Sequence, residues 1–305
     1  MSRIVPGNAI GVTETVEALR RGLIVGLPTE TVYGLAADLA NDDAISNVFS
    51  VKGRPSSHPL IVHIARHEQL FDLAESVTTA CTTLVAHAWP GPLTVVVRAR
   101  SNVSRVVTGG QDTVAVRLPG HQLAQDVITG LGRPVAAPSA NRFGRVSPTS
   151  AQHVLDDLGT DVPVILDGGN CLVGVESTIV DCTTAQPEIL RHGSVTVDTI
   201  RDLLADIDVT LADTPSGTTR ASGMLARHYA PKARLVLHEN AADLPDSTAV
   251  VLRCDGDAVD TARHLFERLR ELDRAGVDTA HVVLPPAVGL GIAIRDRLFK
   301  AAAHL

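Results

Sequence analysis

The chain has 305 residues, 45% of them hydrophobic, and a formal net charge of −7. This length suits two domains of ordinary size or one large domain with a substantial core. The sequence has no apolar run of about 18 residues, so no membrane-spanning helix is expected. The acidic charge argues against a broad nucleic-acid-binding face, although not against a local basic cleft.

The N-terminus and the cysteines bear on the compartment. The first residues, MSRIVPGNAIGVTE, lack the charged-then-apolar layout of a secretory signal, so we expect a cytoplasmic protein. The four cysteines show no CxxC spacing: Cys81, Cys171, Cys182 and Cys254. Scattered reduced thiols in the core are therefore expected, rather than a metal or redox site.

The chain opens with a helix pattern and a strand pattern. Thr13 and Glu14 begin an amphipathic segment that stops at Gly22, as in a capped helix. Residues 23–27 form a short continuous apolar run, typical of a strand buried on both faces, and Pro28 ends it.

Short strand and helix patterns alternate from there to about residue 191. Helices are predicted at 44–51, 68–75, 79–88, 121–131 and 150–158, and strands at 59–65, 93–99, 113–118, 133–137, 162–166, 177–181 and 188–191. So many β segments among the helices favour a mixed, twisted α/β sheet over a helical bundle.

A linker and a second α/β pattern follow. Residues 213–219, DTPSGTT, read as a flexible linker. After it, strands are predicted at 234–238, 248–253 and 280–284, and helices at 257–274 and 292–304. We therefore divide the chain into a large α/β domain at 1–207, a linker at 208–233 and a small C-terminal α/β domain at 234–305.

Lys52 is one of only three lysines in an arginine-rich chain. It follows the helix predicted at 44–51 and precedes the break at Gly53-Arg54-Pro55. A cation is favoured at a helix C-terminus by the helix dipole, so position alone leaves two readings open: a counter-charge for the helix or a cation with a specific use.

Several loops that adjoin apolar strands present hydroxyls, glycines or cations. They are residues 29–31, 138–141 and 174–178. Ligand clefts of α/β sheets collect at strand ends, so these loops are candidates to line one cavity. Together with Lys52, Arg54, Arg117 and Arg191, such a cavity would suit a ligand with a triphosphate and a carboxylate, because guanidinium groups match both anions.

Other motifs give weaker or negative signals. The sequence shows no serine nucleophile elbow, Cys/His nucleophile pair, HExxH or Walker lysine loop. His63 lies in an apolar strand, where a satisfied core histidine is the usual reading. Gly289-Leu290-Gly291 before the last helix is more typical of a tight turn than of a phosphate cradle.

Ordered motifs nevertheless form a specific signature. PTETVYGL, KGRP with a following HPL, TVAVRLP, APSAN, GVEST and ILRHG resemble the YrdC-like domain of threonylcarbamoyl-AMP synthases. GMLARHYAPKA and GLGIAIRDRLFKAA resemble the linker and last helix of the two-domain form of that family. The resemblance implies a twisted mixed YrdC/RibB-like sheet with helices, a linker and a small Rossmann-like α/β domain.

The resemblance also implies a nucleotidyltransferase reaction. L-threonine, bicarbonate or CO2 and ATP would give threonylcarbamoyl-AMP and pyrophosphate, with Mg²⁺ accompanying ATP. A separate transferase complex would use the product for the N6-threonylcarbamoyladenosine (t6A) modification of tRNA, with little or no direct tRNA binding by this chain. Because the intermediates are labile in water, a cover over the site is expected.

Site residues follow from the matching motif positions. Threonine would be held by Thr31, His63, Arg117, Ala137 and Ser177, with Arg117 on its carboxylate. ATP would contact Lys52, Arg54, His58, Thr113, Ser139, Ser147, Arg191 and Tyr229, of which Lys52 and Arg54 would be catalytic. No protein ligand for a metal can be named.

Two departures from the family pattern affect these expectations. His58 stands where asparagine is common, and Ser222 replaces a proline before Gly223-Met224. The C-terminal domain is also short for the two-domain form. Two other functions stay open: an RNA-binding module with a concave basic surface, and a carbamoyltransferase that uses carbamoyl phosphate, although proteins of that kind carry extra domains.

Overall fold

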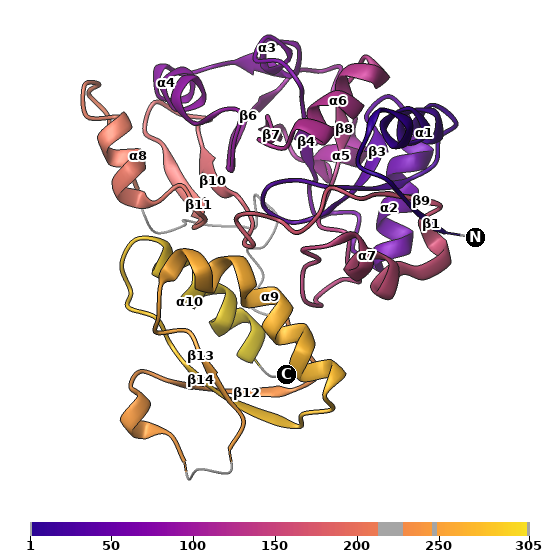
Figure 1. The fold of residues 1–305 in the computed structure, drawn as a ribbon. Coiled ribbons are helices and arrows are strands. Elements are labelled where there is room, and N and C mark those ends of the chain that lie inside the picture. The colour runs from indigo at the N-terminus through magenta and orange to yellow at the C-terminus, as the bar shows by residue number, and fades with distance from the viewer. Residues whose placement is uncertain (1, 213–227, 246–248, 304–305) are drawn as a thin grey trace.

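The computed structural model describes residues 2–212, 228–245 and 249–303. The linker pattern at 213–219, the departure at Ser222 and residue 248 of one predicted strand lie outside these residues. The described chain forms a large domain with one sheet and a small domain with another (Figure 1). No helix in the described parts of the chain is long and apolar enough to cross a membrane.

Eleven strands in the described residues form the large sheet. Their order is β1-β9-β2-β3-β8-β4-β7-β6-β10-β11, and β5 pairs with β6. The sheet is mixed, since β4 pairs with β7 in parallel and β6 pairs with β7 in antiparallel orientation. The strands are β1 Arg3–Val5, β2 Val25–Leu27, β3 Gly34–Asp38, β4 Ile61–His63, β5 Ala74–Ser76, β6 Leu93–Ala99, β7 Thr113–Arg117, β8 Val135–Ala136, β9 Val164–Leu166, β10 Thr178–Asp181 and β11 Glu188–Arg191.

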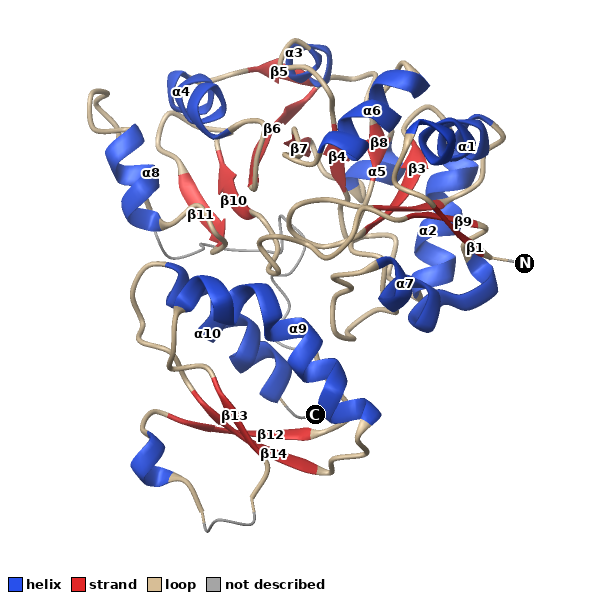
Figure 2. Ribbon diagram, viewed as in Figure 1, coloured by secondary structure: helices blue, strands red, loops and turns tan. Residues whose placement is uncertain are grey.

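Helices of the large domain pack around this sheet, as Figure 2 shows. They are α1 Ala9–Arg20, α2 Asp42–Lys52, α3 Gln69–Leu73, α4 Thr79–Ala88, α5 Arg105–Thr108, α6 Gln122–Leu131, α7 Ala151–Leu158 and α8 Val197–Leu203, with a 3-10 turn η1 at Gly159–Asp161. The mixed α/β fold predicted from the sequence is therefore confirmed.

The first helix begins earlier than the sequence pattern suggested. The prediction started it at Thr13, but α1 starts at Ala9, because the Asn8 side chain accepts hydrogen bonds from the backbone N–H groups of Ile10 and Gly11. Asparagine is a strong helix N-cap for this reason. The cap overrides the Thr-Glu pair, which lies inside the helix.

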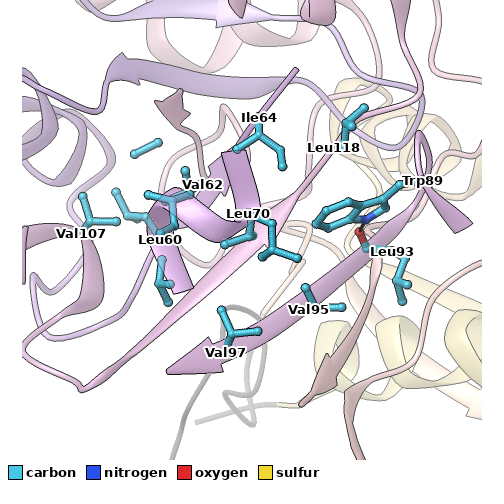
Figure 3. Packing of buried hydrophobic residues seen from close by; sticks show 14 of the residues in the cluster. Leu60, Val62, Ile64, Leu70, Trp89, Leu93, Val95, Val97, Val107 and Leu118 are labelled. Carbon is cyan, nitrogen blue, oxygen red and sulfur yellow. Dashed lines mark hydrogen bonds between the residues drawn. The ribbon is translucent and has the colours of Figure 1, made fainter. Parts of the chain in front are cut away.

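A buried apolar cluster between the sheet and the helices holds the large domain together (Figure 3). Val62 of β4 and Val95 of β6 belong to this cluster together with Trp89, and the indole N–H donates to the Leu93 carbonyl oxygen at 2.7 Å. A buried indole needs such a partner to offset the loss of water. All four cysteines are buried free thiols, as the sequence analysis expected.

The small domain is a three-stranded parallel sheet with two helices. Its order is β12-β14-β13, formed by β12 Arg234–His238, β13 Val251–Arg253 and β14 Thr279–Val283, with the 3-10 turn η2 at Ala241–Asp243. Helices α9 Ala258–Arg274 and α10 Leu290–Ala302 lie between this sheet and the large domain (Figure 1). The α/β character of the C-terminal domain is thereby confirmed.

The two domains share an apolar core. Val32, Val146 and Val175 belong to loops of the large domain, yet they pack in the same buried cluster as Phe266 of α9 and Ile294 of α10.

An ion pair reinforces this contact. The Arg270 guanidinium of α9 donates to the Asp157 carboxylate of α7 at 2.6 Å and to the Val146 carbonyl oxygen at 2.6 Å. The small domain is therefore seated directly on the loops that carry the site described below.

Candidate active site

A pocket lies where several strand ends and loops of the large domain meet the end of the linker. All five residues expected to bind threonine line it, together with four of those expected to contact ATP. The lining residues are Thr29, Thr31, Val32, Gly34, Arg54, Ile61, His63, Arg117, Ala137, Pro138, Ser139, Glu176, Ser177, Arg191, His228 and Tyr229.

Arg117 ends β7 and is buried at one corner of the pocket. Its guanidinium donates to the Thr31 hydroxyl at 2.9 Å and to the Gly91 carbonyl oxygen at 3.2 Å, and it pairs with the Glu30 carboxylate at 2.7 Å. Burial acts to raise the pKa of Glu30, but the Arg117 charge and hydrogen bonds outweigh it and the net shift is downward. The corner is therefore a fixed, charged arrangement in which Arg117 is already oriented.

His63 lies beside Arg117, because β4 and β7 place the two residues in register. Burial lowers the pKa of His63 to about 3, and the Arg117 charge acts in the same direction. The ring is therefore neutral near pH 7. Its Nδ1 lies 3.2 Å from the Ile61 carbonyl oxygen, which can only accept, so Nδ1 carries the proton and Nε2 is left as an acceptor.

Ser177 and Arg191 also line the pocket and are bonded to each other. The Arg191 guanidinium donates to the carbonyl oxygen and the hydroxyl of Ser177, both at 3.0 Å. The same hydroxyl lies 2.8 Å from that of Thr94 on β6. Ser177 directly precedes β10, so these contacts link Arg191 at the end of β11 to Thr94 on β6 through Ser177.

Arg54 and Lys52 are placed differently from one another. Arg54 lines the pocket and donates to the Pro59 carbonyl oxygen at 3.0 Å; burial lowers its pKa to about 10, which leaves it charged near pH 7. Lys52 is absent from the lining, and its ammonium donates to the carbonyl oxygens of Ser139 and Asn141, at 2.5 and 2.6 Å. The structure thus places Lys52 behind the 139–141 loop.

Three other expected ATP residues also lie outside the pocket lining. Thr113 starts the strand that Arg117 ends, about 13 Å away at roughly 3.3 Å per residue. His58 lies in the segment before β4, with its ring 5.7 Å from that of Phe143, and Ser147 donates to the Glu176 carboxylate at 2.6 Å. An extended nucleotide could span the distance from the pocket to Thr113. The Ser147 hydroxyl already donates its hydrogen bond to Glu176.

The end of the linker closes one wall. Tyr229 lines the pocket, is 1% exposed, and has a φ of 63°, which is uncommon for a residue with a side chain. Its ring stacks on Phe266 at 5.5 Å, and its hydroxyl has no hydrogen-bond partner among the described residues. The small domain therefore holds the ring, and the hydroxyl stays available for a ligand.

Sequence reasoning placed Glu30 and Glu176 in loops expected to line the cavity, residues 29–31 and 174–178, but gave neither glutamate a role. Both are buried carboxylates next to residues that were named, and each pairs with an arginine far away in the chain, Arg117 and Arg297 respectively. A glutamate beside a threonine or serine is ordinary in a loop. One signal could have identified them: each is the only acidic residue in a motif that is otherwise apolar or rich in hydroxyl groups.

The balance of charge defines what the pocket can bind. Arg54, Arg117 and Arg191 all line it, whereas Glu176 is the one carboxylate among the described lining residues. Buried guanidinium groups facing a small cavity suit carboxylate and phosphate oxygens. The described residues contain no group of three or more His, Cys, Asp or Glu side chains placed to hold a metal ion.

The fold and the pocket define a two-domain α/β protein whose larger domain carries an anion-binding site. A family model described as telomere recombination matches residues 17–193, and one described as the C-terminal domain of threonylcarbamoyl-AMP synthase matches residues 195–303. The chain belongs to the threonylcarbamoyl-AMP synthase family.

Individual relatives agree with this assignment. The chain is 40% identical to a threonylcarbamoyl-AMP synthase of Pyrococcus abyssi, over 94% of this chain and 92% of the relative, and 36% identical to one of Bacillus subtilis, over 95% and 92%. A crystal structure of the P. abyssi protein complexed with L-threonine superposes with a TM-score of 0.90, at 36% identity, and covers 99% of this chain and 97% of that one.

Proposed function

We propose that this chain makes threonylcarbamoyl-AMP and pyrophosphate from L-threonine, bicarbonate or CO2 and ATP. The observation that carries the proposal is the meeting, in one pocket, of the Arg117–Thr31–His63 corner with the guanidinium groups of Arg54 and Arg191. The first group suits an amino acid, and the second suits phosphates. The names of the relatives and the threonine in the P. abyssi crystal structure support threonine and an adenylate-forming nucleotide as substrates.

The reaction needs no protein nucleophile. The threonine amine forms an N–C bond to CO2 and loses a proton, which gives a carbamate. A carbamate oxygen then attacks the α-phosphorus of ATP, the bond to the bridging oxygen of the β-phosphate breaks, and pyrophosphate leaves. Catalysis in this scheme is positioning and charge stabilisation.

The pocket residues have distinct roles in this scheme. Arg117 would bind the threonine carboxylate, and the Nε2 atom of neutral His63 would accept a hydrogen bond from the amine, which must be uncharged to react. Arg54 and Arg191 would offset the charge that develops on the departing pyrophosphate. Tyr229 would cover the labile intermediates against water.

We propose that Mg²⁺ enters with ATP. The carboxylates next to the site, Glu30 and Glu176, are paired with Arg117 and Arg297. Magnesium sites in nucleotide enzymes often rely on substrate phosphates and water with only one or two protein ligands. The ion would add positive charge to the phosphates, and the arginines would orient them.

Further proposals concern the wider setting. The product would pass to a separate tRNA threonylcarbamoyl transferase complex, and the chain itself would bind tRNA weakly or not at all. A cytoplasmic location, expected from the N-terminal sequence, fits this setting and stays a prediction.

A substrate-omission assay tests the proposed reaction. Purified protein is incubated with ATP, Mg²⁺, threonine and bicarbonate, while pyrophosphate is measured by an enzyme-coupled assay and the adenylate by mass spectrometry. Pyrophosphate should appear only when both threonine and bicarbonate are present, together with threonylcarbamoyl-AMP. Pyrophosphate release that ignores threonine would refute the proposal, and carbamoyl phosphate replacing bicarbonate would favour a carbamoyltransferase.

A further inference from the structure

Arg297 is the most deeply buried cation of the described small domain. It lies on α10 and has no exposed surface. Its guanidinium donates to the Glu176 carboxylate at 2.9 Å and to the Asp296 carboxylate at 2.7 Å, and its Cζ lies 5.3 Å from the centre of the Tyr229 ring. A buried guanidinium is tolerated only when its charge is paired and its donors are used. Here two of those three partners belong to the active site.

Glu176 connects Arg297 to the pocket. One carboxylate oxygen accepts from Arg297, and the other accepts from the Ser147 hydroxyl at 2.6 Å. Burial acts to raise the pKa of Glu176, but Arg297 and Arg191 outweigh it and the net shift is downward, so the group stays ionised near pH 7. Ser147 and Tyr229 are both among the residues expected to contact ATP, so Glu176 joins Arg297 to the nucleotide side of the pocket.

Tyr229 depends on the same helix. Its left-handed backbone is a strained conformation, of the kind that persists only where its surroundings hold it. The neighbouring His228 N–H donates to the Lys300 carbonyl oxygen of α10, and the next residue, Ala230, donates to the Gly144 carbonyl oxygen of the large domain. The Arg297 guanidinium over the ring is a cation–π contact with little water around it.

We propose that Arg297 is a positioning residue for the reaction, through which the small domain fixes Glu176 and Tyr229 at the nucleotide side of the pocket. The inference rests on the proposed function. It gives the C-terminal domain a specific part in the active site. Among the described residues, only Arg297 donates a hydrogen bond to Oε2 of Glu176, and no group of the large domain does so. The part played by Arg297 is indirect, since it does not line the pocket.

Kinetics of Arg297→Gln test this role. The change keeps most of the side-chain length but removes the charge, which leaves Glu176 buried with one counter-charge fewer. We expect the KM for ATP to rise at least about tenfold, with less than about a threefold change for threonine, since losing one partner of a buried pair is costly. Arg297→Lys should give a smaller rise, because lysine keeps the charge but cannot lie flat on the ring and fork to Glu176.

Coupling to Glu176 gives a second readout. The Arg297→Gln and Glu176→Gln changes should be strongly non-additive, so that the double variant binds ATP better than Arg297→Gln alone. Should Arg297→Gln fail to fold, Arg297→Lys and Glu176→Gln decide the matter, because each must also raise the ATP KM selectively.

Arg295→Gln is the matched control. Arg295 lies on the same helix but pairs with Glu239 inside the small domain, so its loss should leave both KM values unchanged. Wild-type protein that fails the substrate-omission assay would sink the proposed function. A working wild type with folded Arg297 variants of unchanged ATP KM, or with equal loss for both substrates, would overturn the positioning role alone.

Discussion

At the scale of single residues, the pocket is built from side chains that are already paired before any ligand arrives. Arg117 illustrates this, since Thr31, Gly91 and Glu30 fix its guanidinium in place. Such pre-orientation reduces the entropy that binding must otherwise remove. It also means that changes to one residue disturb its partners.

Arg117→Ala should raise the threonine requirement far more than the ATP requirement. Loss of a charged hydrogen-bonding partner costs about 1.5–3 kcal/mol, or roughly 10- to 150-fold in the threonine KM. Steady-state pyrophosphate assays with each substrate varied in turn measure both values. Arg21→Ala, at an exposed position after α1, should change neither, and equal effects of Arg117→Ala on the two substrates would show that its role is misplaced.

Tyr229→Phe should separate catalysis from stability. The hydroxyl has no partner among the described residues, so its removal should leave the free energy of unfolding within about 0.5 kcal/mol of wild type. If the hydroxyl covers the bound nucleotide, the yield of threonylcarbamoyl-AMP per ATP consumed should fall about fivefold, the value of one hydrogen bond. Product and AMP are counted by liquid chromatography.

Tyr33→Phe provides the opposite control for the cover. The Tyr33 hydroxyl donates to the Gly169 carbonyl oxygen and accepts from the Gly168 N–H, away from the pocket lining. Its loss should cost stability and leave the product yield unchanged. A Tyr229→Phe protein with wild-type yield would rule out the cover.

At the scale of elements, helix α2 bears on the two roles that the sequence left open for Lys52, a counter-charge for the helix end and a cation with a specific use. The helix ends at Lys52, followed by Gly53 with a left-handed φ of 65°, one residue beyond the predicted end. The ammonium is not a free counter-charge, because it bonds to two carbonyl oxygens of the 139–141 loop. The helix end thus holds a loop that contributes Ser139 to the pocket.

Lys52→Met should therefore destabilise the protein. Two buried carbonyl oxygens would lose their donor, and we expect the free energy of unfolding to fall by about 2 kcal/mol in urea titrations. Lys232→Met, at an exposed position, should have no measurable effect. Unchanged stability with lost ATP turnover would instead assign Lys52 to the phosphates directly.

The sequence predicted elements well where apolar periodicity was strong and poorly where it was absent. The strands at β4, β6, β7 and β10 and the helices α4, α6, α7 and α9 were predicted within a few residues. The strand β3, with the sequence GLAAD, was missed because glycine, alanine and aspartate have low β propensity, so pairing with β2 and β8 decides its conformation.

Other elements were missed or overextended for related reasons. Strands β1 and β5 have three residues each, and helices α5 and α8 have four and seven, which is too short for a clear period. The helix predicted at 68–75 is only Gln69–Leu73, because the chain turns into β5 at Ala74.

The site could be predicted from ordered motifs but not from pairwise contacts. Motif positions placed nine of the thirteen expected ligand residues on one pocket. The pairing of Glu176 with Arg297 spans 121 positions, and nothing in the spacing of the sequence reveals it. Only the fold brings these two residues together.

At the scale of the whole molecule, buried histidines link folding to pH. Burial lowers the pKa of both His63 and His228 to about 3, against an ordinary value near 6.5. The unfolded chain therefore takes up protons that the folded protein does not. This contribution to stability is fully present above about pH 6.5 and is lost as the pH falls from there toward 3.

Urea unfolding at pH 7.5 and pH 5.0 tests this linkage. Each of the two histidines should lower the free energy of unfolding by about 2 kcal/mol between these values, because the unfolded state binds its proton in that range. His63→Gln should remove about half of the difference, whereas His87→Gln, at an exposed position, should leave it intact. A pH difference that is undiminished in His63→Gln would contradict the assignment.

Three valines of the large domain pack in the core of the small domain. This packing determines what a truncated protein would expose. Val32, Val146 and Val175 sit against α9 and α10, and Glu176 meets its arginine on the same face. In a fragment that ends before the linker, the three valines would be exposed to solvent, and Glu176 would lose its ion pair with Arg297. Removing the C-terminal domain should therefore expose apolar surface and an unpaired carboxylate beside the pocket of the larger domain.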